Sequence, residues 1–362
     1  MAILLILFFL VYFGVFMLHP RFGHLPTGNY LKRIKQSPNY RDGQFQNQSI
    51  TPNFTEGANV WRVMLEFFFK KPKRSMPAKA LPSQKSDLKK LSPEEDILVW
   101  FGHSSYFIQA DGKTILVDPV FSGHASPVKF TTKAFKGTDV YTTADLPDID
   151  YLFITHDHWD HLDYRTMLNL KGRVKKIITG LGTASHLEYW GFDKAIIEEL
   201  DWDYSVALAD GFMVHAAPAR HFSGRAFTRN RTLWMSFVLR TPTMNLYLGG
   251  DSGYDSHYKA IGEQFGPFDL AILECGQYNE YWKYIHMMPD EVVKAAKDLK
   301  AEKLLPVHWG KFSLGLHDWD EPIIKVTQAA GEQGMPIVTP MIGQKVHLKA
   351  NEQFTEWWQG IE

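Results

Sequence analysis

The pattern of hydrophobic and polar positions predicts a layered domain that begins near residue 95. Short apolar runs of strand length alternate there with stretches whose apolar residues recur at helical spacing. The expected strands are 97–101, 106–109, 114–117, 151–154, 176–179, 195–198, 212–216, 233–239, 245–248, 270–273 and 303–307. The expected helices lie near 163–170, 183–190, 256–264 and 289–299. This alternation predicts sheets that are covered by helices.

The segment 1–18 carries no charged side chain and consists mainly of Leu, Ile, Phe and Val. As a helix it would extend over about 27 Å, close to the thickness of a bilayer's hydrocarbon core. A cleaved signal peptide is the alternative, but a basic start and a small-residue cleavage site are missing. We therefore expect an N-terminal membrane anchor. The basic residues after it, at positions 21, 32, 33 and 35, predict that the C-terminal bulk of the chain lies on the cytoplasmic side.

Residues 19–94 are expected to form an extended arm and linker between the anchor and a folded domain at 95–362. Proline, glycine and asparagine are frequent in the first part of this segment, and no apolar periodicity is sustained there. One amphipathic helix is predicted at 60–69. Its apolar face could lie at a lipid surface, but packing on the domain is the favoured alternative.

Composition narrows the class of function. The chain has 362 residues, of which 45% are apolar and 14% aromatic, which is enough to bury a sizeable core. Its formal net charge is −1, so no overall field would attract nucleic acid, and we expect no nucleic-acid partner. The single Cys275 excludes an internal disulfide.

The strongest chemical signal follows the apolar run 151–154. His156, His158, Asp160 and His161 come directly after this expected strand, and open α/β sheets bind their ligands at such strand ends. A lone histidine is more often a surface or core residue. Imidazole and carboxylate groups packed this closely, however, would stay poorly compensated without a cation. The spacing therefore predicts a metal site.

Three further polar residues follow apolar runs downstream, and together with the first cluster they could hold two ions. His221 follows the run 212–217, Asp251 follows 245–250, and His308 follows 303–307. We assign the seven residues as follows: His156, His158 and His221 to one ion, Asp160, His161 and His308 to the other, and Asp251 as a bridge. This ligand chemistry suits two zinc ions, with iron or manganese as alternatives.

The chain resembles the metallo-β-lactamase-fold hydrolases, whose ligand pattern is His-x-His-x-Asp-His followed by His, Asp and His at later strand ends. Further motifs resemble N-acyl-phosphatidylethanolamine-hydrolysing phospholipase D and its bacterial relatives over about residues 95–320. These motifs lie at 100–105, 115–122, 146–150, 161–164, 249–254, 265–271 and 308–310. The resemblance implies an α+β fold, a four-layer αβ/βα sandwich of two mixed sheets flanked by helices. It also implies a phosphodiesterase that acts on a phospholipid through a hydroxide shared by two ions.

Candidate catalytic residues follow from the chemistry of such a reaction. Asp160 and Asp251 belong to the metal site, and His286 is the candidate general acid, by resemblance and because histidine titrates near neutral pH. His286, Arg220 and Arg225 are expected to bind the phosphate. Asp118, which ends the run 114–117, is expected to orient a metal-binding histidine rather than to bind metal.

Two positions depart from the family pattern. Trp159 and Ile285 stand where the family pattern has Tyr and Gln, and both changes remove a polar group expected near the scissile phosphate. One alternative is a lactonase of phosphorylated sugar lactones on the same fold, and another is a membrane-anchored metal-binding scaffold. The expected partners are a phospholipid substrate and a membrane, and the sequence leaves open whether the chain forms a homodimer.

Overall fold

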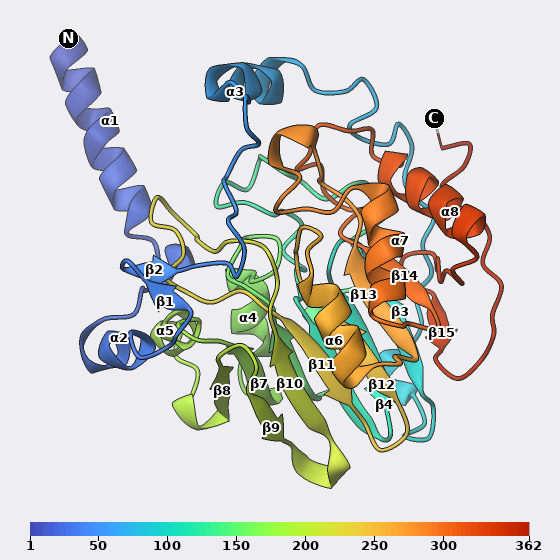
Figure 1. Ribbon diagram of the computed structural model, residues 1–362. Coiled ribbons are helices and arrows are strands. Elements are labelled where there is room, and N and C mark those ends of the chain that lie inside the picture. The colour runs from blue at the N-terminus through green and yellow to red at the C-terminus, as the bar shows by residue number, and fades with distance from the viewer. Residues whose placement is uncertain (362) are drawn as a thin grey trace.

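The computed structural model describes residues 1–361, and Glu362, the last residue of the predicted domain, lies outside the described residues. Its helices are α1 (Ala2–Met17), α2 (Gly28–Ile34), α3 (Val60–Phe69), α4 (Tyr164–Leu170), α5 (Ala184–Tyr189), α6 (His257–Phe265), α7 (Pro289–Asp298) and α8 (Glu321–Gln333). Two large sheets form the body of the molecule, and α1 projects from it (Figure 1).

The first large sheet has seven strands in the order β15-β3-β4-β5-β6-β7-β8. Its strands are β3 (Ile97–Trp100), β4 (Tyr106–Ala110), β5 (Lys113–Val117), β6 (Ile149–Ile154), β7 (Val174–Gly180), β8 (Ile197–Leu200) and β15 (Lys345–His347). Strands β5 to β8 are parallel, whereas β15, β3, β4 and β5 pair antiparallel.

The second large sheet has six strands in the order β14-β13-β12-β11-β10-β9. Its strands are β9 (Ser205–Ala207), β10 (Met213–Ala217), β11 (Ser236–Arg240), β12 (Asn245–Leu248), β13 (Leu270–Glu274) and β14 (Leu304–Val307). The pairs β12–β13 and β13–β14 are parallel, and the other pairs are antiparallel.

Alternation along the strands divides the core into two layers. In β3, Leu98 and Trp100 belong to the cluster between the two sheets, whereas Ile97 and Val99 belong to the cluster on the outer face. Successive side chains of a strand point to opposite faces, so a strand covered on both sides is apolar at every position. This is why the strands appeared in the sequence as continuous apolar runs.

Helices cover the outer face of each sheet. Buried residues of α4 and α5 pack in the outer cluster of the seven-stranded sheet, and α7 packs on β13 of the other sheet with α6 and α8 beside it (Figure 1). Helix α7 begins at Pro289, and the side chain of Glu291 accepts a hydrogen bond from the Met288 N–H. Both features favour a helix start. The expected four-layer αβ/βα sandwich is confirmed.

Most of the expected elements are found, but several differ in their bounds or were not predicted, among them α2, β9 and β15. Residues 194–196 form a 3₁₀ turn, so β8 begins only at Ile197. Strand β11 begins only at Ser236. The N–H groups of Leu233 and Met235 instead donate to the carbonyls of Leu181 and Thr155, which follow β7 and β6 of the other sheet. Helix α8 was not predicted, although its buried residues, Pro322, Ile323, Val326 and Ala330, have helical spacing.

The predicted membrane anchor is wrong. Helix α1 has 16 residues, which corresponds to about 24 Å of helix and is shorter than the hydrocarbon core of a bilayer. Throughout residues 1–361, no helix has the length and apolar character needed to span a membrane. The prediction of a cytoplasmic domain attached to that anchor is therefore also withdrawn.

The arm at 19–94 lies on the body of the molecule. It contains the hairpin of β1 (Tyr40–Arg41) and β2 (Gln44–Phe45), and Phe45 is buried with its N–H donating to the Asn230 carbonyl. In α3, Val63 is buried while Trp61 and Leu65 are exposed. The favoured packing of this helix on the domain is thus limited to one side of it.

Candidate metal centre

The carboxyl ends of neighbouring strands bring the predicted site residues to one edge of the sandwich. Strands β5 and β6 pair Val117 with Phe153, which places Asp118 beside the segment that starts at Thr155. Strands β13 and β14 pair Glu274 with Val307, so His308 comes next at the same edge. The two sheets meet there, and all seven predicted metal residues lie in two adjoining groups.

The backbone at this edge is strained. His103, Asp118, Gln277 and His308 all have positive φ angles, between 41° and 68°, although none is glycine. Such conformations cost about 1–3 kcal/mol each and concentrate at functional sites. Gly250, just before Asp251, is needed because neighbouring atoms leave no room for a side chain. A Cβ there would lie 2.7 Å from the Met235 carbonyl oxygen and 2.8 Å from the Thr155 Cβ.

The first group consists of His156, His158, His221 and one oxygen of Asp251. The His158 Nδ1 lies 2.9 Å from the His156 Nε2 and 3.3 Å from the His221 Nε2. The Asp251 Oδ2 lies 3.8 Å from the His156 Nε2 and 3.7 Å from the His221 Nε2. Three ring nitrogens and a carboxylate oxygen therefore face a common point.

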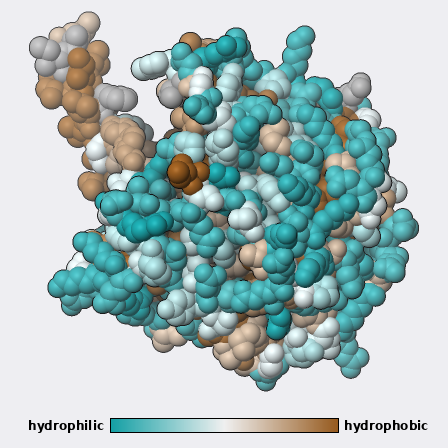
Figure 2. Space-filling model, viewed as in Figure 1, coloured by the Kyte–Doolittle hydropathy of each residue, from teal (hydrophilic) through white to brown (hydrophobic). Residues whose placement is uncertain are grey.

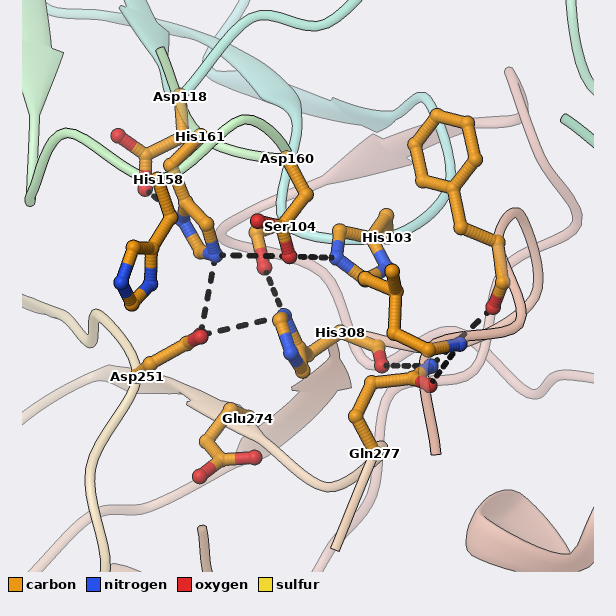
Figure 3. A network of polar contacts seen from close by, with 12 residues as sticks. His103, Ser104, Asp118, His158, Asp160, His161, Asp251, Glu274, Gln277 and His308 are labelled. Carbon is orange, nitrogen blue, oxygen red and sulfur yellow. Dashed lines mark hydrogen bonds and ion pairs between the residues drawn. The ribbon is translucent and has the colours of Figure 1, made fainter. Parts of the chain in front are cut away.

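The second group lies on the other side of Asp251. The Asp251 Oδ1 lies 3.2 Å from the His161 Nε2 and 3.1 Å from the His308 Nδ1, and the Asp160 Oδ2 lies 3.6 Å from the His161 Nε2 (Figure 3). One carboxylate thus directs each of its oxygens at a different group. This is the arrangement expected of a bridging ligand.

Partners outside the two groups orient several of the imidazoles. The His161 Nδ1 lies 2.7 Å from the Asp118 Oδ2 (Figure 3). The other Asp118 oxygen, Oδ1, accepts a hydrogen bond from the Thr155 N–H. The His221 Nδ1 donates to the Ile285 carbonyl at 2.9 Å. A proton held at Nδ1 leaves Nε2 with a free lone pair, which is the form that binds a metal. The predicted orienting position of Asp118 matches this geometry.

Electrostatics at the centre favour a cation. Burial tends to raise the pKa of Asp251, but His161 and His308 outweigh this and hold it well below the usual value. Burial and the neighbouring histidines lower the pKa of His156 well below its usual value, which favours a neutral imidazole. The His161 Nε2 and the Asp251 Oδ1 are buried without a hydrogen-bond partner among the described residues. Because such orphaned atoms are costly, this donor set fits metal ions.

His103 is a site residue that the sequence reasoning missed. It is fully buried, its Nε2 lies 2.9 Å from the Asp160 Oδ2, and it belongs to the second group of residues that could hold a metal (Figure 3). The next residue, Ser104, places its Oγ 2.8 Å from the His308 Nδ1. The signal was present, because Gly102-His103-Ser104 follows an apolar run just as the other site residues do.

His286 lies beside the two groups and has a buried carboxylate behind it. Its Nδ1 lies 3.2 Å from the Glu274 Oε1, which also accepts the Met287 N–H. Burial tends to lower the pKa of His286, but Glu274 outweighs this and raises it. Burial in turn raises the pKa of Glu274. Glu274 was not predicted, although it directly follows the apolar run 270–273, as the other site residues follow theirs.

A cavity of about 440 Å³ opens over the centre. Its polar wall includes members of both groups together with His286 and Gln277, and its remaining wall is largely apolar. The apolar lining residues are Phe54, Val63, Met64, Phe222, Trp282, Ile285 and Leu314. Three of these belong to the arm, so the segment before residue 95 completes the cavity.

Of the two arginines expected to bind phosphate, neither lines this cavity. Arg225 is 4% exposed, donates to the carbonyls of Arg21, Asp157 and Leu162, and stacks its guanidinium 4.1 Å from the Trp159 ring centre. Arg220 donates to the Thr51 hydroxyl and the Ile50 carbonyl of the arm. Arg229 lines the cavity instead, with its guanidinium 4.7 Å from the Phe222 ring centre.

Comparison with known proteins places this site in a family. Residues 113–309 match the family model described as Beta-lactamase superfamily domain. An uncharacterised protein of Mycobacterium tuberculosis is 37% identical over 329 residues, which cover 90% of this chain and 88% of that protein. The N-acyl-phosphatidylethanolamine-hydrolyzing phospholipase D 1 of Caenorhabditis elegans is 29% identical over 300 residues, covering 76% and 81% of the two chains.

A solved structure has the same fold. Igni18, a metallo hydrolase of the archaeon Ignicoccus hospitalis, superposes with a TM-score of 0.52 at 20% identity. The match covers 69% of this chain and 97% of Igni18. At this identity the likeness concerns the fold alone.

Proposed function

This chain belongs to the beta-lactamase superfamily and is a metal-dependent hydrolase, and from that premise we propose that it cleaves a phosphodiester of a phospholipid. The bond to be cleaved is the one that a phospholipase D hydrolyses, between the phosphate and the alcohol of the head group. N-acyl-phosphatidylethanolamine and related lipids are the proposed substrates, by analogy with the enzyme of C. elegans.

We assign two zinc ions to the two groups of residues. His156, His158 and His221 would hold one ion, Asp160, His161 and His308 the other, and Asp251 would contact both. Bound zinc supplies Lewis acidity and activates water near neutral pH. The protein contributes the fixed orientation of the imidazoles, through Asp118 and the Ile285 carbonyl, and a partly apolar cavity that limits competing water.

The observation that carries this proposal is the division of the cavity into a polar and an apolar wall. A phospholipid has the same division, with one phosphate next to long acyl chains. Arg229 can pair with the phosphate as a bidentate donor. The apolar lining, from Phe54 to Leu314, offers contact to the acyl chains. A phosphorylated sugar lactone would instead require polar groups along this wall, so the lactonase alternative has less support.

His286 is the proposed general acid, and Glu274 its positioning residue. With the Nδ1 of His286 held by the Glu274 carboxylate, the Nε2 proton can be given to the leaving alkoxide oxygen. The carboxylate also favours the protonated imidazole that this step requires. In this step the O–H bond of the released alcohol forms while the N–H bond of His286 breaks.

Helix α3 is the proposed contact with a lipid surface. Trp61 is 76% exposed and Leu65 58% exposed, while Val63 and Met64 of the same helix line the cavity. Figure 2 shows that the surface around α3 combines apolar and strongly polar residues. Lys70 and Lys73 follow the helix and would favour anionic head groups. A lipid bound there would lie close to the cavity mouth.

The test is mass spectrometry of a total lipid extract before and after incubation with the zinc-loaded protein. Asp251→Asn, which keeps the shape of the side chain but removes its charge, is the matched inactive control. We expect loss of N-acyl-phosphatidylethanolamine and gain of phosphatidic acid and N-acylethanolamine with the wild type only. Turnover of a phosphorylated lactone without any change in lipids would overturn the phosphodiesterase, and zinc binding without any turnover would favour a scaffold.

A further inference from the structure

A second pocket lies behind the loop that carries the first metal-site residues. It has a volume of about 320 Å³ and forms where the chain leaves α1 and passes beside the start of α4. Its lining includes His19, Arg21, His124, Lys129, Trp159 and Arg165. None of its lining residues also lines the cavity over the metal centre. The proposed function makes no use of this pocket.

Positive charge in the pocket is not compensated. Arg21, Lys129 and Arg165 all line it, and none of them forms an ion pair with a carboxylate anywhere in residues 1–361. The only carboxylate in the lining is Asp163, which is buried. Asp163 already accepts hydrogen bonds from the Ser122 N–H, the Arg165 N–H and the Thr166 hydroxyl. Three cations therefore face one carboxylate whose oxygens are occupied.

The histidines add hydrogen-bond donors to the same space. The His19 Nδ1 accepts from the Arg21 N–H at 3.1 Å and from the Arg21 Nε at 3.0 Å. A neutral imidazole that accepts at Nδ1 carries its proton at Nε2, which leaves that N–H available to a ligand. Burial, Arg21 and Lys129 lower the pKa of His19, as expected where cations converge.

The remaining wall is aromatic. Trp159 and Tyr164 line the pocket, and the His19 ring packs edge-on against Tyr164 with 6.0 Å between ring centres. Trp159 is held in place by the Arg225 guanidinium on its face and by Phe22, whose ring centre is 5.3 Å away. A pocket with several cationic donors and a rigid aromatic wall suits a compact anion that carries an organic group.

We propose that this pocket is a binding site for a phosphate-bearing anion. The phosphate oxygens would accept from the Lys129 ammonium, the Arg165 guanidinium and the His19 Nε2–H, and the rest of the ligand would lie against Trp159. The same chemistry is offered by a soluble phosphate ester and by the phosphate of an anionic lipid head group. Trp159 lies between His158 and Asp160 in the sequence, so a ligand in this pocket would contact the loop that carries these two predicted metal residues.

The experiment compares three zinc-loaded, full-length proteins: the wild type, Lys129→Ala/Arg165→Ala, and Lys32→Ala/Lys297→Ala. The last variant removes two exposed lysines that do not line the pocket and so controls for the change in net charge. Phosphate that binds at the metal centre is common to all three proteins. Calorimetry measures the binding of inorganic phosphate and of sn-glycerol 3-phosphate, and sedimentation measures binding to phosphatidylglycerol and phosphatidylcholine vesicles.

We expect the pocket variant to bind at least one of the anionic probes at least tenfold more weakly than the other two proteins. A loss confined to the soluble esters identifies a free phosphate ester, and a loss confined to phosphatidylglycerol vesicles identifies a lipid head group. Equal binding by the pocket variant and the control variant, or no binding by the wild type beyond that at the metal centre, would overturn the proposal. Both variants should keep the wild-type rate on a soluble phosphodiester, so this result is independent of the proposed function.

Discussion

The metal centre and its cover come from two regions that differ in how they are built. The residues assigned to the ions follow strand ends of the sandwich, where parallel strands and backbone strain fix their positions. The cover comes from the arm, which reaches the cavity with Phe54, Val63 and Met64 but contributes no residue to the groups that could hold a metal. Chemistry and substrate access are thus assigned to separate parts of the chain.

This difference leads to an ordering of effects. Changes at strand ends should affect every substrate, because they alter the groups that act on the phosphate. Changes in the arm should affect lipids in particular, because they alter how a large apolar substrate reaches the cavity.

The largest effect is expected for His158→Ala. The variant removes one of the three ring nitrogens of the first group, and losing an ion forfeits several kcal/mol of transition-state stabilisation. This corresponds to a fall in kcat/KM of about 10³-fold or more on lipid and soluble phosphodiesters alike. Elemental analysis should find two metal ions per wild-type chain and at least one fewer in the variant.

The control for this prediction is His347→Ala, which removes an exposed histidine from β15 at the edge of the sheet. It should retain full metal content and activity. A chelator should abolish activity of the wild type, and added zinc should restore it. Well-folded wild-type protein with a single ion would exclude the dinuclear assignment.

The second prediction separates proton transfer from substrate binding. A lipid alkoxide needs a proton to leave, whereas a nitrophenolate leaves unaided. His286→Ala should therefore slow phospholipid hydrolysis by about 10²- to 10⁴-fold and slow bis-p-nitrophenyl phosphate far less. The measurement is kcat/KM for both esters with metal content determined in each protein. Equal losses on the two esters would mean that His286 binds the phosphate and delivers no proton.

Glu274→Gln tests the positioning role through pH. Glu274 raises the pKa of His286, and a group with a raised pKa is protonated below that pKa and loses its proton as pH rises through it. Lipid hydrolysis should therefore fall on the alkaline side of the profile, and the fall should move to lower pH in the variant. An unchanged alkaline limb would contradict the role of Glu274.

The same division explains what could be predicted from the sequence. One apolar run is followed by His156, His158, Asp160 and His161, and three others are followed by His221, Asp251 and His308. Parallel strands bring such ends together, so the seven-residue set was accessible from spacing alone. His103 followed the same rule and was overlooked. Glu274 also follows an apolar run, 270–273, and was not considered, and its pairing with the distant His286 is visible only in the folded chain.

The arginines and the arm show where the sequence was insufficient. The loop 220–231 has four arginines, and only the packed structure shows that Arg225 is buried on Trp159 while Arg229 lines the cavity. Their roles depend on contacts with the arm and with the metal loop that are distant in sequence. In the N-terminal segment, apolar composition suggested a span, but the length of the helix decided against it.

The fourth prediction concerns access through α3. Trp61→Ser/Leu65→Ser removes two exposed apolar side chains beside the cavity mouth. Loss of part of their transfer free energy to lipid should lower kcat/KM on phospholipid vesicles about tenfold. The rate on bis-p-nitrophenyl phosphate should not change. Ile324→Ser, at an exposed apolar position on α8, is the matched control. An equal loss of kcat/KM in that variant would mean that α3 has no specific role in lipid access.

The smallest effect is expected where Asn47 of the arm bonds to the backbone of a predicted metal residue. The Asn47 Nδ2 donates to the His221 carbonyl at 2.7 Å, and its Oδ1 accepts the His221 N–H at 3.1 Å. Asn47→Ala should destabilise the fold by about 1 kcal/mol, because water can replace part of these bonds at a half-buried position. Zinc affinity, measured by chelator competition, should fall by about tenfold, as for other groups that orient a ligand.

Gln46→Ala is the control, since its side chain bonds only within the arm. If both variants bind zinc as the wild type does, the arm covers the centre without positioning it, and the separation of chemistry from access is complete. If only Asn47→Ala weakens zinc binding, the arm also helps to hold His221 in place. Removing the arm should then lower zinc affinity as well as the rate on phospholipid.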